Sequence, residues 1–119
     1  MASEARVDPS CLFCRIARHE IPSTKVFEDD EFYAFRDIAP QAPTHVLVVP
    51  KAHLPRLSAA SPTDAPMLAR LVLTVANVAA SEKAADYRLV VNNGAGAGQS
   101  VDHLHLHLLA GRSFGWPPG

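Results

Sequence analysis

The stretch that decides the fold is His103-Leu104-His105-Leu106-His107-Leu108-Leu109, in which histidine and leucine alternate. Side chains two residues apart in an extended strand point to the same face of a sheet. The three imidazoles are therefore predicted to share one face, while the leucines between them enter a hydrophobic core on the other. The pattern indicates a half-buried β-strand whose polar face carries chemistry.

A loop of small residues precedes this strand, Asn92-Asn93-Gly94-Ala95-Gly96-Ala97-Gly98-Gln99-Ser100. Glycines let a backbone approach an anion closely, and successive N–H groups can cradle its oxygens. The expected partner of the histidines is thus an electrophilic phosphorus. Its non-bridging oxygens would lie against the Asn92 amide and the backbone N–H groups around Gly98 to Ser100.

The central histidine, His105, is the candidate nucleophile because it has an imidazole on either side. A neutral imidazole attacks through one nitrogen when the other donates to a fixed acceptor, such as a backbone carbonyl. The neighbouring histidines are expected to keep the cluster mostly neutral at pH 7. The Ser100 hydroxyl or His107 would give a proton to the leaving group.

Two other interpretations of the histidines stay open. They can fill the polar face of a strand without chemistry, or all three can bind one metal ion, as three imidazoles do in catalytic zinc sites. Against the second interpretation, Cys11 and Cys14 supply a separate thiolate pair that would need histidines of its own.

The composition limits the class of protein. The chain has 119 residues, of which 48% are hydrophobic and 19% charged, and its formal net charge is −1. This length allows one domain with a real core. The charge gives no indication of a nucleic-acid partner, and no apolar run approaches the ~20 residues of a membrane helix. Residues 1–10 are expected to be flexible and lack a signal peptide's apolar segment, so the cytoplasm is the expected location.

Periodicity and turn residues divide the rest of the chain into short elements. The motif Ser61-Pro62-Thr63-Asp64 predicts the start of a long helix that runs to about Ala84. Together the elements predict an α+β domain, with a mostly antiparallel sheet covered on one face by the long helix. The other expected elements are a short helix over 12–18, strands over 25–28, 32–36, 45–49, 88–92 and 103–109, and an extended tail over 111–119.

The chain resembles the histidine triad (HIT) family, and within it the histidine triad nucleotide-binding (Hint) branch. The resemblance covers nearly the whole chain from Cys11 onward, and it implies one HIT domain over residues 11–119 with a sheet extended across a homodimer. Residues 110–119 would form a tail near the partner's site. The matching motifs are Phe27-Glu28-Asp29-Asp30, residues 34–45, Val49-Pro50-Lys51-Ala52-His53, the triad over 100–109 and Trp116-Pro117-Pro118-Gly119.

The resemblance implies a purine nucleoside phosphoramidase, which hydrolyses the P–N bond of adenosine or guanosine 5′-monophosphoramidates such as AMP-lysine. His105 would form a nucleotidyl-histidine that water then hydrolyses. The residues implied around the phosphate and leaving group are Asn92, Gly98, Ser100 and His107. Asp37 would bind the ribose hydroxyls. The residues implied to enclose the base are Phe13, Ile16, Ile21, Phe35 and Ile38. Trp116, on the tail, would lie near the neighbouring subunit's site.

Some of these assignments have a plainer interpretation from the residues themselves. The apolar base-pocket residues pass equally well as core, and Asp37 can simply cap its loop. A dinucleoside polyphosphate hydrolase of the same superfamily stays open as an alternative function. So does a non-catalytic nucleotide- or zinc-binding regulator.

The resemblance also implies a zinc site, as in many bacterial members of the family. Its ligands would be Cys11, Cys14, His53 and His103, and two thiolates with two imidazoles form the closed set of a structural zinc. The alternative is a pair of reduced, partly buried thiols.

Asp102 departs from the family pattern, which often has an aromatic residue directly before the triad. On a strand its carboxylate should face away from the imidazoles. If it faced them, it would raise their pKa values and favour the cation. His45 begins a strand that is expected to lie near the triad.

Overall fold

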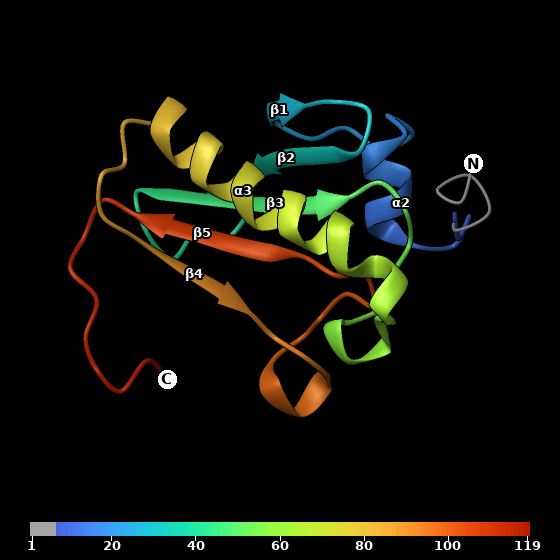
Figure 1. The fold of residues 1–119 in the computed structure, drawn as a ribbon. Helices are drawn as coiled ribbons and strands as arrows, with labels where there is room; N and C mark the ends of the chain where they lie inside the picture. The colour runs from blue at the N-terminus through green and yellow to red at the C-terminus, as the bar shows by residue number, and fades with distance from the viewer. Residues whose placement is uncertain (1–6) are drawn as a thin grey trace.

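The computed structural model describes residues 7–119, and in them five strands form one antiparallel sheet in the order β1-β2-β3-β5-β4 (Figure 1). The predicted α+β fold, with one long and one short helix, is thereby confirmed. The expected flexible N-terminus falls mainly on residues 1–6, which lie outside the described residues. The elements are α2 (Leu12–Ala17), β1 (Lys25–Glu28), β2 (Phe32–Arg36), β3 (Thr44–Pro50), α3 (Ala65–Ser81), β4 (Tyr87–Val91) and β5 (Leu106–Ala110), with turns of 3-10 helix at Leu57–Ala59, Pro62–Asp64 and Ala95–Ala97.

Helix α3 follows a cap built by Ser61 and Asp64. The Asp64 carboxylate accepts the Ser61 backbone N–H at 2.9 Å, which completes a capping box. One turn of 3-10 helix forms first, and the α-helix begins at Ala65. No helix within residues 7–119 is long and apolar enough to cross a membrane. The side chains that α3 buries recur at helical spacing: Leu71, Thr74, Val75, Val78 and Ala79.

Each face of the sheet carries its own hydrophobic cluster, because successive strand residues point to opposite faces. On the face that α3 covers, the strands contribute Phe32, Ala34, Val46, Val48, Leu106 and Leu108. The opposite face packs against α2, and its cluster contains Phe13, Cys14, Ile16, Tyr33, Phe35, Leu47 and Val49. Leu104 belongs to the first cluster, so the histidines that flank it face the second.

Strand β5 begins at Leu106, three residues later than the sequence predicted. Of the three histidines only His107 lies in the ladder, opposite Leu47 of β3 and Val90 of β4. The alternation persists upstream because the Leu104 backbone N–H donates to the Leu54 carbonyl at 2.7 Å instead of to a strand. The segment is therefore held extended by a loop, and its side chains keep the predicted faces.

Candidate functional site

The three histidines form one cluster between the sheet and α2. His103 and His105 are buried, with 0% and 5% of their surface exposed, and His107 is half-buried. The Phe13 ring of α2 packs edge-on against His105, with ring centroids 5.0 Å apart. The His105 and His107 rings are also 5.0 Å apart. Imidazoles in such an apolar setting are poorly solvated, which favours their neutral forms.

His105 is oriented by a backbone carbonyl, as the sequence predicted. Its Nδ1 lies 2.7 Å from the carbonyl oxygen of His103. A carbonyl oxygen only accepts, so Nδ1 carries the proton and donates it. The neutral ring then presents an unshared electron pair on Nε2, which is the form that can attack an electrophile.

His107 is oriented by His45, and the backbone decides where their protons sit. The Gln41 backbone N–H donates to His45 Nδ1 at 3.0 Å, so the neutral His45 ring carries its proton on Nε2. That proton is donated to His107 Nδ1 at 3.0 Å, which leaves the His107 proton on Nε2. Among residues 7–119, His107 Nε2 is buried without a hydrogen-bonding partner. A buried donor without a partner is suited to meet a substrate atom.

The acid–base properties of the cluster follow from burial. Burial, with smaller contributions from neighbouring imidazoles, lowers the pKa of both His103 and His107 from the ordinary 6.5 to about 4. Burial likewise lowers the pKa of His45, against the opposing effect of Asp37. The sequence analysis attributed neutrality to the neighbouring histidines alone. Loss of hydration is the larger cause, and sequence spacing does not reveal it.

We expect the stability of the protein to decrease as the pH falls from about 6.5 toward about 4. An unfolded His107 titrates near 6.5 and the folded one near 4, so between these values the unfolded chain binds more protons. Urea unfolding at pH 7.5, 6 and 5 measures the change, and His107→Asn should flatten the slope. An unfolding free energy independent of pH over this range in the unmodified chain would contradict the assignment.

The glycine-rich loop is braced by the side chain of Gln99. Its Oε1 accepts the Gly94 N–H at 2.7 Å, and its Nε2 donates to the Pro55 and Val101 carbonyls at 2.7 and 3.0 Å. Gly98 has a φ of 96° and lies beside the Asn92 amide, whose Nδ2 would be 3.8 Å from a Cβ at that position. The loop can therefore present backbone N–H groups and one amide in a fixed shape.

Replacing Gln99 with Ala is expected to destabilise the protein by about 1–3 kcal/mol, because three half-buried backbone groups lose their partner. Asn77→Ala is the matched control, since Asn77 is an exposed amide on α3 and its loss should change stability by less than about 0.5 kcal/mol. Urea unfolding of the two variants measures the difference. Equal stabilities would show that the Gln99 contacts do not hold the loop.

Asp102 does not face the histidines. It is exposed, and its Oδ1 accepts a hydrogen bond from Arg56 Nη2 at 2.6 Å. The Asp102 carboxylate is thus paired with the Arg56 guanidinium. Since the two residues are 46 positions apart, no local pattern in the sequence indicates the pair.

The residues implied for the nucleoside are only partly brought together. The Phe13 and Phe35 rings are 5.5 Å apart, and both residues are buried with Ile16 in the cluster against which Ile21 packs. This is the core position that their sequence also allows. Asp37 lies near the histidines, with Oδ2 3.5 Å from His45 Nε2 and Oδ1 accepting the Ala39 N–H.

Three further residues that were predicted to belong to the site are exposed. Ile38 is 100% exposed and the Trp116 side chain is 85% exposed, so neither is enclosed by its own chain. Ser100 is exposed at the end of the glycine-rich loop.

Four metal-binding side chains converge beside His103. The Cys11 and Cys14 sulfurs lie 3.3 and 3.5 Å from His103 Nδ1, and His53 Nδ1 lies 3.2 Å from His103 Nδ1 and 3.4 Å from the Cys14 sulfur. A tetrahedral zinc with Zn–N of about 2.0–2.1 Å and Zn–S of about 2.3 Å keeps its ligands about 3.3–3.8 Å apart. The four distances lie within or close to this range, and all four atoms are within 4.8 Å of one another, so the group fits such an ion.

The protonation of these groups fits a cation as well. His103 Nε2 donates to the Pro50 carbonyl at 2.8 Å, so Nδ1 presents an electron pair toward the sulfurs. Burial, with a smaller contribution from Cys11, raises the pKa of the Cys14 thiol to about 11, so this thiol is protonated at neutral pH unless a cation binds it. Two adjacent thiolates in such a place need a bound cation. Because His103 turns to the cysteines while His107 pairs with His45, the three triad histidines do not converge on one metal.

Sequence reasoning missed the groups that orient these side chains. It placed His45 near the triad but did not identify Gln41 as the source of its orienting N–H. It also assigned no role to Gln99 or Arg56. The glutamine in the glycine-rich loop could have indicated that its side chain holds the loop in place. The Gln41 backbone N–H has no signal in the sequence.

Comparisons with known proteins agree with this architecture. The model of the HIT domain family matches residues 18–114. An uncharacterized HIT-like protein of Synechocystis sp. is 55% identical over 109 residues, which is 91% of this chain and 96% of that protein. A second such protein, from Synechococcus elongatus, is 50% identical over the same shares of the two chains.

Solved structures are similar over the same range. A HIT family hydrolase from Legionella pneumophila has a TM-score of 0.89 and 49% identity, over 92% of this chain and all of that one. A histidine triad protein from Clostridium difficile has a TM-score of 0.88 and 39% identity, over 91% of this chain and 96% of that one. The family match covers most of the sequence, and the fold and the triad agree with it. The chain belongs to the HIT domain family.

Proposed function

We propose that this protein is a hydrolase of the Hint type, a purine nucleoside phosphoramidase that cleaves the P–N bond of adenosine or guanosine 5′-monophosphoramidates. The observation that carries the proposal is the pair of ring nitrogens on His105 and His107. One presents an electron pair, and the other presents a buried N–H without a partner. A nucleophile beside a proton donor is what displacement of an amine from phosphorus requires.

In the first step, His105 Nε2 attacks the α-phosphorus and the P–N bond breaks. The nitrogen leaves as an amine after it receives the His107 Nε2 proton, or that of Ser100. The Asn92 amide and backbone N–H groups near Gly98 would stabilise the charge on the non-bridging oxygens. Water then attacks the nucleotidyl-histidine and gives a proton to the free His107 Nε2, the P–N bond to His105 breaks, and nucleoside monophosphate is released.

Nucleoside recognition completes the proposal. Asp37 is half-buried and uses one oxygen to accept the Ala39 N–H, so electron pairs remain for two ribose hydroxyls. Phe13, Ile16, Ile21, Phe35 and Ile38 would surround the base. A zinc ion on Cys11, Cys14, His53 and His103 would have a structural role, linking the start of α2 to the triad.

The assay that tests this function supplies adenosine 5′-phosphoramidate and AMP-lysine, with diadenosine polyphosphates as the competing substrates. We expect AMP to form much faster from the phosphoramidates. Preferential cleavage of the dinucleotides would favour the polyphosphate hydrolase of the same superfamily. Tight AMP binding without turnover of any of them would favour a non-catalytic regulator.

We also propose that two chains form a homodimer through strand β4. This strand is at the edge of the sheet and exposes Leu89 and Val91, and α3 exposes Val72 beside it. An apolar hollow of about 140 Å³ lies between them. An exposed apolar sheet edge favours pairing with another strand. A second copy would extend the sheet and bring each C-terminal tail, with its exposed Trp116, near the other site.

Substituting Leu89 with Glu is expected to convert the dimer into monomers, because two like charges would face each other at the paired edges. Sedimentation of the variant and the unmodified chain at micromolar concentration measures the difference. Thr63→Glu, at an exposed position before α3, serves as the charge-matched control and should leave the dimer intact. A monomeric unmodified chain would refute the proposed interface.

A further inference from the structure

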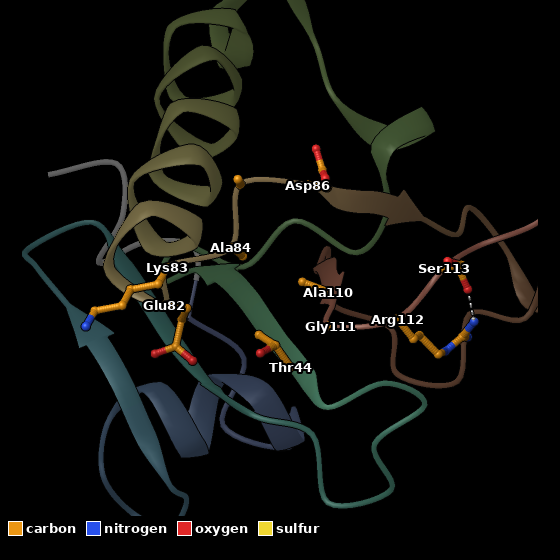
Figure 2. A pocket seen from close by; sticks show the side chains of 10 residues that line it. Thr44, Glu82, Lys83, Ala84, Asp86, Ala110, Gly111, Arg112 and Ser113 are labelled. Atoms are coloured by element: carbon orange, nitrogen blue, oxygen red, sulfur yellow. Dashed lines mark hydrogen bonds between the residues drawn. The ribbon is translucent and has the colours of Figure 1, made fainter.

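The segment after β5 is fastened to the loop that precedes β3. Gly111 has a φ of 96°, and a side chain there would lie 2.8 Å from Pro43 Cβ, so the two backbones pass in close contact. The next residue, Arg112, reaches across and donates from Nε to the Gln41 carbonyl at 2.9 Å. Figure 2 shows Arg112 beside a hollow of about 520 Å³, with its bond to the Ser113 carbonyl.

The Arg112 side chain is held in place by an aromatic ring. Its guanidinium carbon lies 4.2 Å from the centroid of Phe114, and that of Arg88 on β4 lies 5.2 Å from the same centroid. Arg88 also donates to the Gly115 carbonyl at 2.9 Å. A guanidinium over an aromatic face is attracted by the ring quadrupole. The ring therefore holds Arg112 in the orientation in which it donates to Gln41. Arg88, Arg112 and Phe114 together form a clamp on the tail.

Gln41 connects this clamp to the histidines. Its carbonyl accepts from Arg112, and its backbone N–H donates to His45 Nδ1 at 3.0 Å. The side-chain amide of Gln41 closes the loop by donating to the Ala39 carbonyl. A shift of Gln41 would thus change the hydrogen bond to His45. His45 would in turn affect His107, because its Nε2 lies 3.0 Å from His107 Nδ1.

The position of the Gln41 N–H decides which His107 nitrogen carries the proton. When the Gln41 N–H donates to His45 Nδ1, His45 and His107 are both protonated on Nε2. Without it, His45 can be protonated on Nδ1, and its Nε2 then accepts from His107 Nδ1. His107 Nε2 would lose its proton and could not donate to a leaving amine. Asp37, with Oδ2 3.5 Å from His45 Nε2, favours the first arrangement, and the facing His105 ring has no hydrogen bond to either histidine.

We propose that Arg112 is a positioning residue, which acts through the Gln41 backbone to keep the His45–His107 pair in the tautomer that donates a proton from His107 Nε2. The inference rests on the proposed function, in which that proton goes to the leaving amine. It gives the C-terminal tail a role within its own chain, separate from any contact with a second copy.

The test combines ¹⁵N NMR of the histidine side chains with phosphoramidate kinetics, both at pH 7.5 on the full chain. In the unmodified protein we expect His45 and His107 in the Nε2–H form. Arg112→Met, which has no donor at this position, should introduce the Nδ1–H form of both and lower kcat about tenfold, with KM changed less than twofold. That loss is smaller than the ~10²–10⁴ of a removed acid because Asp37 still favours the original tautomer. Arg112→Lys, which can still donate to Gln41, should restore part of the Nε2–H population and part of kcat.

Two further variants serve as controls. Phe114→Leu removes the aromatic ring but keeps Arg112, and it should give a smaller change in the same direction. Arg70→Met removes an arginine whose guanidinium binds Glu31 through two hydrogen bonds, and it should change neither tautomer nor kcat. Unchanged tautomers in Arg112→Met overturn the inference, as does a changed tautomer with unchanged kcat. Since the NMR measurement needs no substrate, a protein without phosphoramidase activity refutes the proposed function while the Arg112 coupling is still tested.

Discussion

His105→Ala is expected to lower kcat/KM for adenosine 5′-phosphoramidate by more than ~10⁴-fold, beyond the usual effect of removing a general acid or base. The reason is geometric. The His103 carbonyl fixes the His105 proton on Nδ1, and the opposite nitrogen has the electron pair that attacks. No neighbouring group can replace it, because His107 presents a proton instead of an electron pair.

The measurement is a steady-state assay with rapid-quench mass spectrometry. The unmodified protein should form a nucleotide adduct on the peptide containing His105, and the variant should form none. His19→Ala is the matched control, since His19 is exposed and pairs with Glu28 away from the triad. Turnover of His105→Ala within tenfold of the unmodified chain would remove His105 from the nucleophilic role.

Cys14→Ser is expected to abolish zinc binding and to lower the thermal stability strongly. A serine hydroxyl does not replace a thiolate toward zinc. At a free zinc concentration about 1,000 times Kd, binding stabilises the folded chain by about 4 kcal/mol. For a domain of this size that corresponds to a decrease in Tm of about 10–20 °C on loss of the ion.

Metal analysis of purified protein and thermal unfolding with and without a chelator measure these effects. We expect about one zinc per unmodified chain, a lower Tm after chelation and recovery when zinc is returned. His19→Asn should keep its zinc, which separates loss of a ligand from loss of any histidine. An unmodified chain that binds no zinc from a zinc-supplied medium would identify Cys11 and Cys14 as reduced thiols.

Loss of zinc should also weaken catalysis by a moderate factor. His103 contributes its ring nitrogen to the cluster with Cys11 and Cys14, and its carbonyl oxygen orients His105. If residue 103 shifts as a whole when the ion is lost, its backbone carbonyl shifts as well. The ion would thus affect the nucleophile without touching the substrate.

The parts of this protein that follow from local patterns were predictable. Alternation set the faces of His103 to Leu109, and the cap at Ser61 placed the long helix. The start of β5 was wrong by three residues because Leu104 is held by a loop carbonyl, which gives the same extended backbone as a strand. Periodicity reports the conformation of a residue and says nothing of which partner provides the hydrogen bond.

The parts of the site that depend on long-range packing were not predictable. The cluster of Cys11, Cys14, His53 and His103 came from a family resemblance, since its members are up to 92 positions apart. The tautomers of His45 and His107 depend on one backbone N–H. Burial, which lowers the pKa of His107, is a property of the folded surface and has no signature in spacing alone.

The ion pair between Arg56 and Asp102 makes two distant positions interdependent. Replacing the arginine alone would leave a negative charge directly before His103, and replacing the aspartate alone would leave a cation beside the glycine-rich loop. A neutral residue introduced at position 102 would therefore need a neutral residue at position 56 as well. A variant library should therefore vary positions 56 and 102 together.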